Sequence, residues 1–321
     1  MTAPATRAAA VDTPPPATDV PAVRLHENAI TGLTTLIAAI EPDQWTLQTP
    51  CPDWGVRALV AHLIAEARWA PPLLAALTIA EIGSSLDTPL DPDPVVAWTT
   101  AQQAAVRAAQ VPHLEQTVVH VSAGDIPAQE YIRQLTADYL VHGWDLAITL
   151  GLNETLDPEL VDAVQRWFPS QAAAYRNAGM IAAPIAVAAD DPQTRLLAAF
   201  GRSREAESTR TAIARFGNAF DRADVDAVMA CMTADCIFES TAPPDGHRHE
   251  GQQSVRQAWT DFFTTSRGAV FETEELTVCG DRAIARWRYT WAPGTKGHVR
   301  GIDLFRVRGN LVAEKLSYVK G

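Results

Sequence analysis

The sequence predicts an all-α helical bundle over residues 22–202 and an α+β domain over residues 211–321. Its length of 321 residues favours two domains, because one domain typically takes about 150 residues. In the first region, apolar residues recur at three- and four-residue steps, as on one face of a helix. In the second, helical stretches precede runs that alternate between apolar and polar residues, which is typical of a curved antiparallel sheet with helices on one face.

The first region begins after a segment, residues 1–21, that is rich in Ala, Pro and Thr. Such a composition cannot offset its own ordering entropy, so we expect a disordered tail. Asp53 and Asp157 are expected helix N-caps, and Pro158 suits the first position of a helix. Gly151 suits the residue just after a helix. Helices are therefore predicted over residues 23–40, from about 54, over 94–109, over 128–150, from 158 and over 193–200.

The second region follows a polar run, residues 203–210, that we expect to be a linker. The dipeptide Gly309-Asn310 is typical of a tight hairpin between two antiparallel strands. Helices are predicted over residues 211–220, 225–232 and 254–265, and strands over 236–239, 271–278, 282–291, 299–307 and 311–319.

The charge balance excludes some classes of partner. The chain has 26 Lys and Arg against 38 Asp and Glu, and the difference, 26 − 38, gives a net charge of −12. This predicts no binding to nucleic acid or to an anionic membrane surface and leaves a small-molecule substrate as the expected partner. No apolar run reaches the roughly 18–20 residues that span a bilayer, and the N-terminus has no long apolar signal segment. Four cysteines are too few for a disulfide scaffold, so a cytoplasmic location fits.

Ionisable residues interrupt the apolar stripe of the helix predicted over residues 128–150. Tyr131, Leu135, Asp138 and His142 recur at steps of three and four, so two ionisable side chains stand where packing favours apolar ones. A buried carboxylate without a partner is costly, so Asp138 needs one. Asp138 and His142 lie one helical turn apart and can direct their polar atoms to a common point.

A third group from another helix would complete a metal site. His62 is the best candidate, because it flanks the apolar stripe of its own helix beside Leu59 and Leu63. Two His and one carboxylate, with water in the remaining position, form a recurrent open zinc site, and the same set suits iron or nickel. The spacing is also met by a buried Asp–His ion pair beside an ordinary histidine, so both interpretations stand at this point.

Two motifs carry a resemblance to a known family: residues 49–62, TPCPDWGVRALVAH, and residues 138–147, DYLVHGWDLA. With the closing segment 191–202, they resemble the DinB-like metal-binding superfamily. The most similar branch is the actinobacterial family that includes mycothiol-dependent maleylpyruvate isomerase.

The resemblance implies a four-helix bundle that binds a divalent metal through His62, Asp138 and His142. Asp138 takes the acidic position that is usually Glu in the isomerase. Such proteins typically bind a low-molecular-weight thiol, such as mycothiol or bacillithiol, as a thiolate that adds to an electrophile. Zinc is the expected metal, with nickel or iron as alternatives, and hydrolysis by a metal-bound hydroxide is the alternative chemistry.

Two neighbours of these motifs need an interpretation of their own. Asp145, three residues after His142, either orients that imidazole as an acceptor or is a carboxylate that faces solvent or caps a helix. Cys51 lies 11 residues before His62. That separation corresponds to about 16 Å along a helix, so we interpret Cys51 as structural.

The second region carries a different resemblance. Residues 216–228, 234–239, 251–256 and 300–307 resemble the SnoaL-like polyketide cyclases of the nuclear transport factor 2-like superfamily. The resemblance implies a cone, in which a curved sheet and its helices enclose an apolar cavity. It also implies a homodimer through the outer face of the sheet.

Catalysts in such cones are carboxylates that point into the cavity, where dry surroundings raise their pKa. Strand alternation places Asp303 on one face with Phe305 and Val307, so Asp303 is the candidate acid or base. An ion pair with Arg286 or Arg288 of a neighbouring strand is the other interpretation of this residue.

Three functions follow from these patterns. The first is a metal-dependent isomerase or thiol transferase with a fused cone domain that binds the substrate. The second is a non-catalytic binding or regulatory protein whose two domains hold small molecules. The third places cyclase or epoxide hydrolase chemistry at Asp303, inside the cone.

Overall fold

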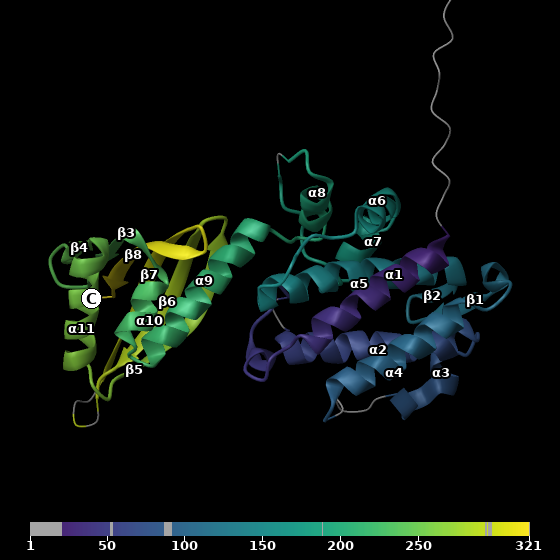
Figure 1. Ribbon diagram of the computed structural model, residues 1–321, viewed down its shortest axis with the longest axis horizontal. Helices are drawn as coiled ribbons and strands as arrows, with labels where there is room; N and C mark the ends of the chain where they lie inside the picture. The colour runs from purple at the N-terminus through teal and green to yellow at the C-terminus, as the bar shows by residue number, and fades with distance from the viewer. Residues whose placement is uncertain are drawn as a thin grey trace, which may run out of the picture.

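The computed structural model of the chain describes residues 21–51, 54–86, 92–187, 189–292, 294 and 297–320. Figure 1 shows two bodies side by side, a helical one from the first two thirds of the chain and one with a sheet from the last third. The two predicted fold classes are confirmed. Residues 1–20 of the expected tail and the expected cap Asp53 lie outside the described residues.

The helical domain is built from four long helices and several shorter elements. The long ones are α1 (Ala22–Ala38), α2 (Val56–Leu74), α4 (Pro94–Ala109) and α5 (Ala128–Leu150). The shorter ones are α3 (Ile79–Ile82), α6 (Pro158–Trp167), α7 (Ala172–Asn177) and α8 (Pro192–Ala199), with a hairpin of β1 (Val118–Val121) and β2 (Gly124–Pro127). None of the helices in the described part of the chain is long and apolar enough to cross a membrane.

The central helix of this domain is α5, which packs against α1, α2 and α6. Its residues Ile132 and Trp144 are fully buried, because other helices cover it on several sides. It ends at Gly151, whose φ of 70° is a left-handed conformation that suits glycine. The next helix, α6, begins at the predicted cap, where the Asp157 carboxylate accepts from the Glu159 amide.

The segment expected to link the domains is helical instead. α9 (Arg204–Asp221) starts before the predicted position, Thr211, and takes in almost all of the polar run. Glu207 and Thr209 are buried on it, and the Thr209 hydroxyl donates to the Gly280 carbonyl oxygen of the second domain. Tertiary contacts therefore stabilise a segment whose polarity alone suggested a linker.

The second domain is a six-stranded sheet packed against α9, α10 (Val225–Ala230) and α11 (Gly251–Thr265). The strands are β3 (Met232–Glu239), β4 (Arg248–Glu250), β5 (Val270–Cys279), β6 (Arg282–Thr290), β7 (His298–Arg308) and β8 (Leu311–Val319). Their order is β4-β3-β8-β7-β6-β5, and every pair is antiparallel except β3 with β8. Strand β4 was not predicted, since three residues are too few to show an alternating pattern.

Glycines shape the sheet at two places. Gly309 and Asn310 join β7 to β8 with φ of 57° and 62°, as the predicted tight hairpin requires. A Cβ at Gly301 on β7 would lie 2.2 Å from the indole of Trp287, its register partner on β6. The missing side chain lets Trp287 lie against the β7 backbone, at the wall of the cavity described below.

His26 on α1 is fully buried in the bundle, with its ring edge-on to Tyr139 of α5. Neither of its ring nitrogens has a hydrogen-bond partner among the described residues. Burial lowers the pKa of His26 from 6.5 to about 4. In the unfolded chain the imidazole of His26 takes up a proton below about pH 6.5, whereas in the folded chain it does so only below about pH 4. The free energy of unfolding should therefore fall by up to about 3 kcal/mol over this range.

Replacing this residue, His26→Phe, should flatten the dependence of stability on pH. We expect the variant to lose less stability than the wild type as the pH falls from 6.5 to 4, by up to about 3 kcal/mol. Urea unfolding of both proteins across this range measures the difference. Parallel stability curves would show that His26 takes up its proton in the folded chain as readily as in the unfolded one.

Candidate metal centre

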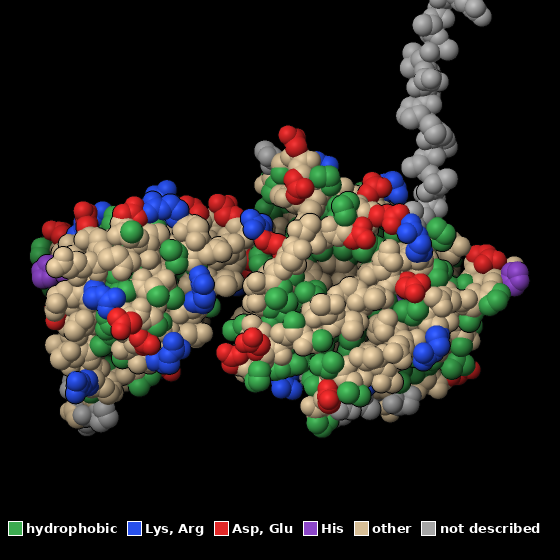
Figure 2. Space-filling view, in the orientation of Figure 1, with side chains coloured by type: hydrophobic (Ala, Val, Ile, Leu, Met, Phe, Trp, Pro, Cys, Tyr) green, Lys and Arg blue, Asp and Glu red, His purple; other side chains and the backbone are tan. Residues whose placement is uncertain are grey.

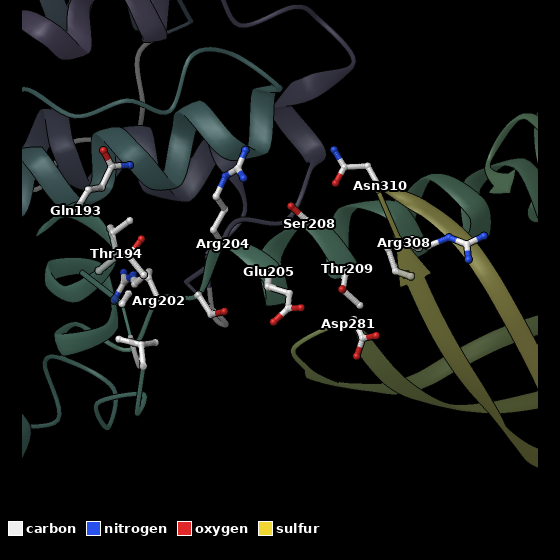
Figure 3. Close-up of a pocket in the computed structure, with 16 residues that line it drawn as sticks. Gln193, Thr194, Arg202, Arg204, Glu205, Ser208, Thr209, Asp281, Arg308 and Asn310 are labelled. Atoms are coloured by element: carbon white, nitrogen blue, oxygen red, sulfur yellow. The ribbon is translucent and has the colours of Figure 1, made fainter. Parts of the chain in front are cut away.

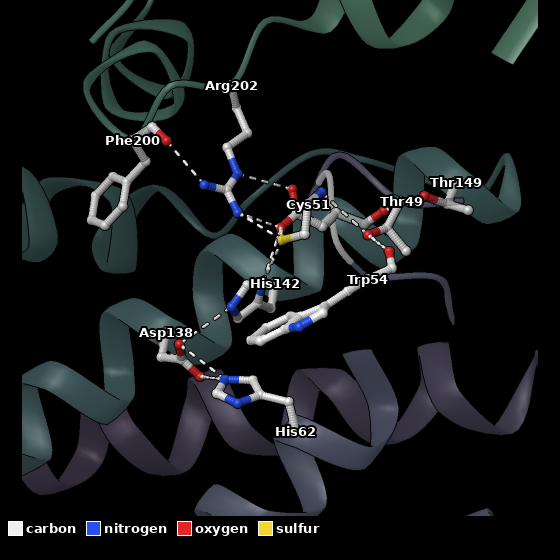
Figure 4. A network of polar contacts seen from close by, with 10 residues as sticks. Thr49, Cys51, Trp54, His62, Asp138, His142, Thr149, Phe200 and Arg202 are labelled. Carbon is white, nitrogen blue, oxygen red and sulfur yellow. Dashed lines mark hydrogen bonds and ion pairs between the residues drawn. The ribbon is translucent and has the colours of Figure 1, made fainter. Parts of the chain in front are cut away.

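Helices α2 and α5 bring the three predicted ligands to one place (Figure 4). Nε2 of His62 lies 3.3 Å from Oδ2 of Asp138, and Nε2 of His142 lies 3.3 Å from Oδ1 of the same carboxylate. One ligand atom from each residue lies within 4.8 Å of the other two. His142 is buried, whereas the side chains of His62 and Asp138 are partly exposed to solvent.

His142 is held between two carboxylates. Its Nδ1 lies 2.9 Å from Oδ2 of the fully buried Asp145 and must donate there, because an ionised carboxylate only accepts. The surface position considered for Asp145 is thereby excluded. Burial by itself would lower the pKa of His142, but the charge of Asp138 and the hydrogen bonds with Asp138, Asp145 and Cys51 raise it well above its usual value.

Asp138 responds to the same pairing in the opposite sense. Burial would raise the pKa of its carboxyl group, but the charge of His142 and hydrogen bonds from His142 and His62 lower it. The carboxyl group is therefore ionised at neutral pH, which is the form in which a carboxylate ligates a metal.

Asp145 is paired in turn with Arg202, which follows α8. Nε and Nη2 of Arg202 donate to the two oxygens of Asp145 at 3.2 and 2.9 Å, and Nη1 donates to the Phe200 carbonyl oxygen. Burial would raise the pKa of Asp145, but the hydrogen bond from His142 and the charge of Arg202 lower it. Asp145 therefore stays ionised in the interior. The result is a fixed acceptor behind the imidazole of His142.

Cys51 lies beside this network, contrary to the prediction that it stands far from the site. Its Sγ is 3.4 Å from Oδ2 of Asp145 and 3.8 Å from Nδ1 of His142. The estimate of about 16 Å applied the rise of a helix to all 11 residues between Cys51 and His62, although the first of them precede the predicted helix. Instead, α2 begins only at Val56, and the chain before it turns back toward α5.

Two further neighbours lie at the site, of which Glu66 was missed in the sequence. The indole of Trp54 lies over both imidazoles, with ring centroids 4.6 Å from His62 and 5.7 Å from His142. Glu66 lies one turn beyond His62 on α2, and burial together with the negative charge of Asp138 raises the pKa of its carboxyl group. The four-residue step from His62 to Glu66 was the available signal for this second acid.

The donor set of the three predicted ligands fits a divalent metal. Two imidazole nitrogens, which must be neutral to ligate a metal, and one carboxylate oxygen match an open zinc site, in which the remaining position takes an exchangeable ligand. The alternative, an Asp–His ion pair beside an ordinary histidine, leaves unexplained why His62 also directs its Nε2 at Asp138. The fixed acceptor at Nδ1 of His142 is a further feature of metal-ligating histidines.

Comparisons with known proteins match both halves of the chain. Residues 213–315 match the SnoaL-like domain, and residues 26–147 match the mycothiol maleylpyruvate isomerase N-terminal domain, which contains all three residues of the site. Uncharacterized proteins of two Mycobacterium tuberculosis strains are each 32% identical over 149 residues, covering 44% of this chain and 72% of theirs. The chain belongs to the mycothiol maleylpyruvate isomerase N-terminal domain family.

This family is metal-binding, in agreement with the cluster of two His and one Asp. The second domain of this family member is SnoaL-like, so the two-domain architecture predicted from the motifs is confirmed. An NTF2-like protein of unknown function from Mesorhizobium loti is 39% identical, covering 37% of this chain and 97% of its own, with a TM-score of 0.34.

The SnoaL-like domain holds the other candidate, Asp303, on the inner face of β7. It is buried, and it lines an aromatic cavity of about 400 Å³. Its partners are Lys315 and Ser317 of β8, at 2.8 and 2.7 Å. The pairing considered with Arg286 is not formed, because that side chain lies on the outer face and pairs with two glutamates of β5. Lys315 was missed in the sequence.

A larger pocket, of about 730 Å³, lies between the two domains (Figure 3). Arg204 and Glu205 line it at the start of α9, and Asp281 and Arg308 line it from the sheet domain. Figure 2 shows that the domains touch over a short stretch and are separated below it. Arg202 lines this pocket and also pairs with Asp145, so it connects the pocket with the network behind His142.

Proposed function

We propose that this chain is a divalent-metal-dependent isomerase or thiol transferase that activates a low-molecular-weight thiol, or water, at His62, Asp138 and His142. The observation that supports this most is the convergence of two imidazole nitrogens on one carboxylate in a partly open site. Zinc is the metal that we propose, and mycothiol is the thiol that the family's name suggests.

A divalent cation held there supplies the positive charge that makes a thiolate or hydroxide available at neutral pH. The residues of the chain have separate tasks around it. Asp145 fixes the ring of His142 through Nδ1, so that Nε2 faces the site. Arg202 balances the charge of Asp145 in the buried network. The indole of Trp54 covers the two imidazoles and limits the access of water.

The SnoaL-like domain would bind a small molecule in its aromatic cavity, separately from the metal centre. The cavity has walls of Phe and Trp side chains and one buried polar cluster, a combination that suits an apolar ligand with a single polar group. Under this proposal, the helical domain carries the metal-dependent chemistry.

Metal analysis of the purified full chain tests the proposal. We expect about one zinc ion per chain by plasma mass spectrometry, and turnover of maleylpyruvate or another electrophile in the presence of mycothiol. A chelator should abolish turnover, and added zinc should restore it. A chain that binds no divalent metal stoichiometrically, even after zinc is added, would contradict the proposal.

Asp145→Asn should weaken metal binding without removing a ligand. The amide can present an N–H instead of a lone pair to Nδ1 of His142, so the ring loses its fixed orientation, and we expect the metal affinity to fall about 10- to 100-fold. Competition with a chromogenic chelator measures the dissociation constant. Asp125→Asn is the matched control, because Asp125 pairs with His120 on the exposed hairpin and should leave the affinity unchanged.

A further inference from the structure

Lysine is rare in this chain. Of the 26 basic residues only three are lysines, and the other 23 are arginines. Lys320 is exposed near the C-terminus, and Lys296 lies outside the described residues. Lys315 on β8, in contrast, is only 6% exposed. A chain whose basic residues are mostly arginines thus places a primary amine in the interior of its second domain.

The amine of Lys315 lies in a compact polar cluster. Nζ is 2.8 Å from Oδ2 of Asp303 and donates to Oγ of Ser317 at 2.8 Å. The hydroxyl of Ser317 donates to Oδ1 of Asp303 at 2.7 Å, which closes a ring of three groups. Since β7 and β8 pair with Asp303 opposite Ser317, the sheet register itself builds this cluster.

Aromatic side chains surround the rest of the amine. Nζ lies 5.4 Å from the ring centroid of Phe238, 5.6 Å from that of Trp259 and 5.8 Å from that of Phe305. These rings stabilise a cation at this point by cation–π attraction. Lys315 and Asp303 also line the aromatic cavity of about 400 Å³, so the amine is accessible to a molecule inside it.

The charges of the cluster select the class of ligand. An anionic ligand would place a second negative charge beside Asp303 in apolar surroundings, where Lys315 is the one cation that pairs with this carboxylate among the described residues. A neutral molecule avoids that cost. Its apolar part would fill the space between the aromatic walls, and a carbonyl oxygen would accept from Nζ.

We propose that Lys315 is an amine nucleophile that binds a neutral, apolar aldehyde or ketone in the cone cavity as an iminium. A primary amine can attack a carbonyl carbon, whereas a guanidinium cannot, which gives a reason for lysine at this position. Asp303 lies within hydrogen-bond distance of Nζ and can take and return the required proton.

The reaction is balanced within the cluster. The ammonium group passes a proton to Asp303, and the free lone pair forms a C–N bond to the carbonyl carbon. The π electrons of the C=O bond move to the oxygen, which takes a proton from the nitrogen. Asp303 then returns its proton to the new hydroxyl group, the C–O bond breaks, and water leaves as the nitrogen lone pair forms the C=N bond.

The net change is one carbonyl and one ammonium group giving one iminium and one water, with no oxidant or reductant. The cluster begins and ends as a cation paired with the Asp303 carboxylate, so the buried ion pair is kept. The three aromatic rings around Nζ stabilise the iminium as they stabilise the ammonium group. None of the residues proposed as metal ligands takes part, so this inference does not depend on the proposed function of the helical domain.

Reductive trapping tests the proposal. The full chain is incubated with 2-naphthaldehyde and sodium cyanoborohydride, which converts an iminium into a stable secondary amine. We expect one adduct by intact mass, located at Lys315 by peptide mapping, and formed at least about tenfold faster than at Lys320. The same labelling is expected in a His142→Ala variant, which separates this test from that of the metal centre.

Variants of the cluster sharpen the test. Lys315→Arg keeps a cation beside Asp303 and should lose the adduct, whereas Lys320→Arg should keep it. Asp303→Asn removes the proton acceptor and should slow labelling at Lys315 at least about tenfold. Equal labelling of Lys315, Lys320 and the N-terminal amine in the wild type, or none at Lys315, would overturn the proposal. Because that comparison is made on the wild-type chain, it stands even if a variant fails to fold.

Discussion

Replacing His142 with alanine should reduce bound zinc from about one ion per chain to a small fraction and lower turnover by about three orders of magnitude. His142 supplies one of the two imidazole nitrogens that converge on Asp138, and two remaining ligands do not complete a stable zinc site. Losing several kcal/mol of charge stabilisation in the transition state corresponds to about a thousandfold in rate. Plasma mass spectrometry and steady-state kinetics measure the two effects.

His120→Ala is the matched control for this variant. His120 also pairs with an aspartate, at 2.7 Å, but on the hairpin of β1 and β2, away from the three ligands. It should retain both the metal and the activity. The opposite pattern, in which His142→Ala keeps its turnover and Asp303→Asn loses it, would show that catalysis occurs in the SnoaL-like domain.

The metal centre could be predicted because its residues break a local pattern. Asp138 and His142 occupy positions of an apolar helical stripe, and the step of four residues directs both to one point. His62 could be proposed only as a group from another helix, and the packing of α2 against α5 is what brings it to Asp138. The sequence thus predicts which residues of one helix lie close together, whereas the contact between two helices could be identified only in the structure.

The groups behind the ligands could not be predicted by the same reasoning. Arg202 is 57 residues from Asp145 in the sequence, and no periodicity relates the two. Cys51 was placed too far from the site, because the rise of a helix was applied to residues that precede α2 and turn back. Contacts made by loops depend on how the chain turns, and such turns leave little periodic signal.

The helices and strands predicted most accurately are those whose periodic pattern of apolar residues extends over many residues. The helices Pro94–Ala109 and Ala128–Leu150 and the strand Leu311–Val319 occupy the predicted residues, since each has several turns or alternations. The start of Arg204–Asp221 was missed, because its first turns are polar and are stabilised by contacts such as that of Thr209 with Gly280. Local sequence does not record that kind of stabilisation.

Lys315→Met should destabilise the second domain by about 3–5 kcal/mol. Asp303 would keep only the hydroxyl of Ser317 as a partner and would be left as a buried carboxylate without a cation. Lys315→Met combined with Asp303→Asn removes both charges, so most of the lost stability should return. Hydrogen exchange at the amides of β7 and β8 reports the opening of this domain separately from the helical one.

Arg286→Met is the control for the loss of a cation from the same sheet. Arg286 pairs with Glu274 and Glu275 on the outer face, where water screens the charges, so its loss should cost less than about 1 kcal/mol. A similarly small effect for Lys315→Met would mean that water reaches the cluster and that the cavity is not dry. A large effect in the single variant and its recovery in the double variant would establish that Lys315 and Asp303 are stable only as a pair. The distance of 2.8 Å between Nζ of Lys315 and Oδ2 of Asp303 is also what allows Asp303 to accept the proton and to return it when a carbonyl compound enters the cavity.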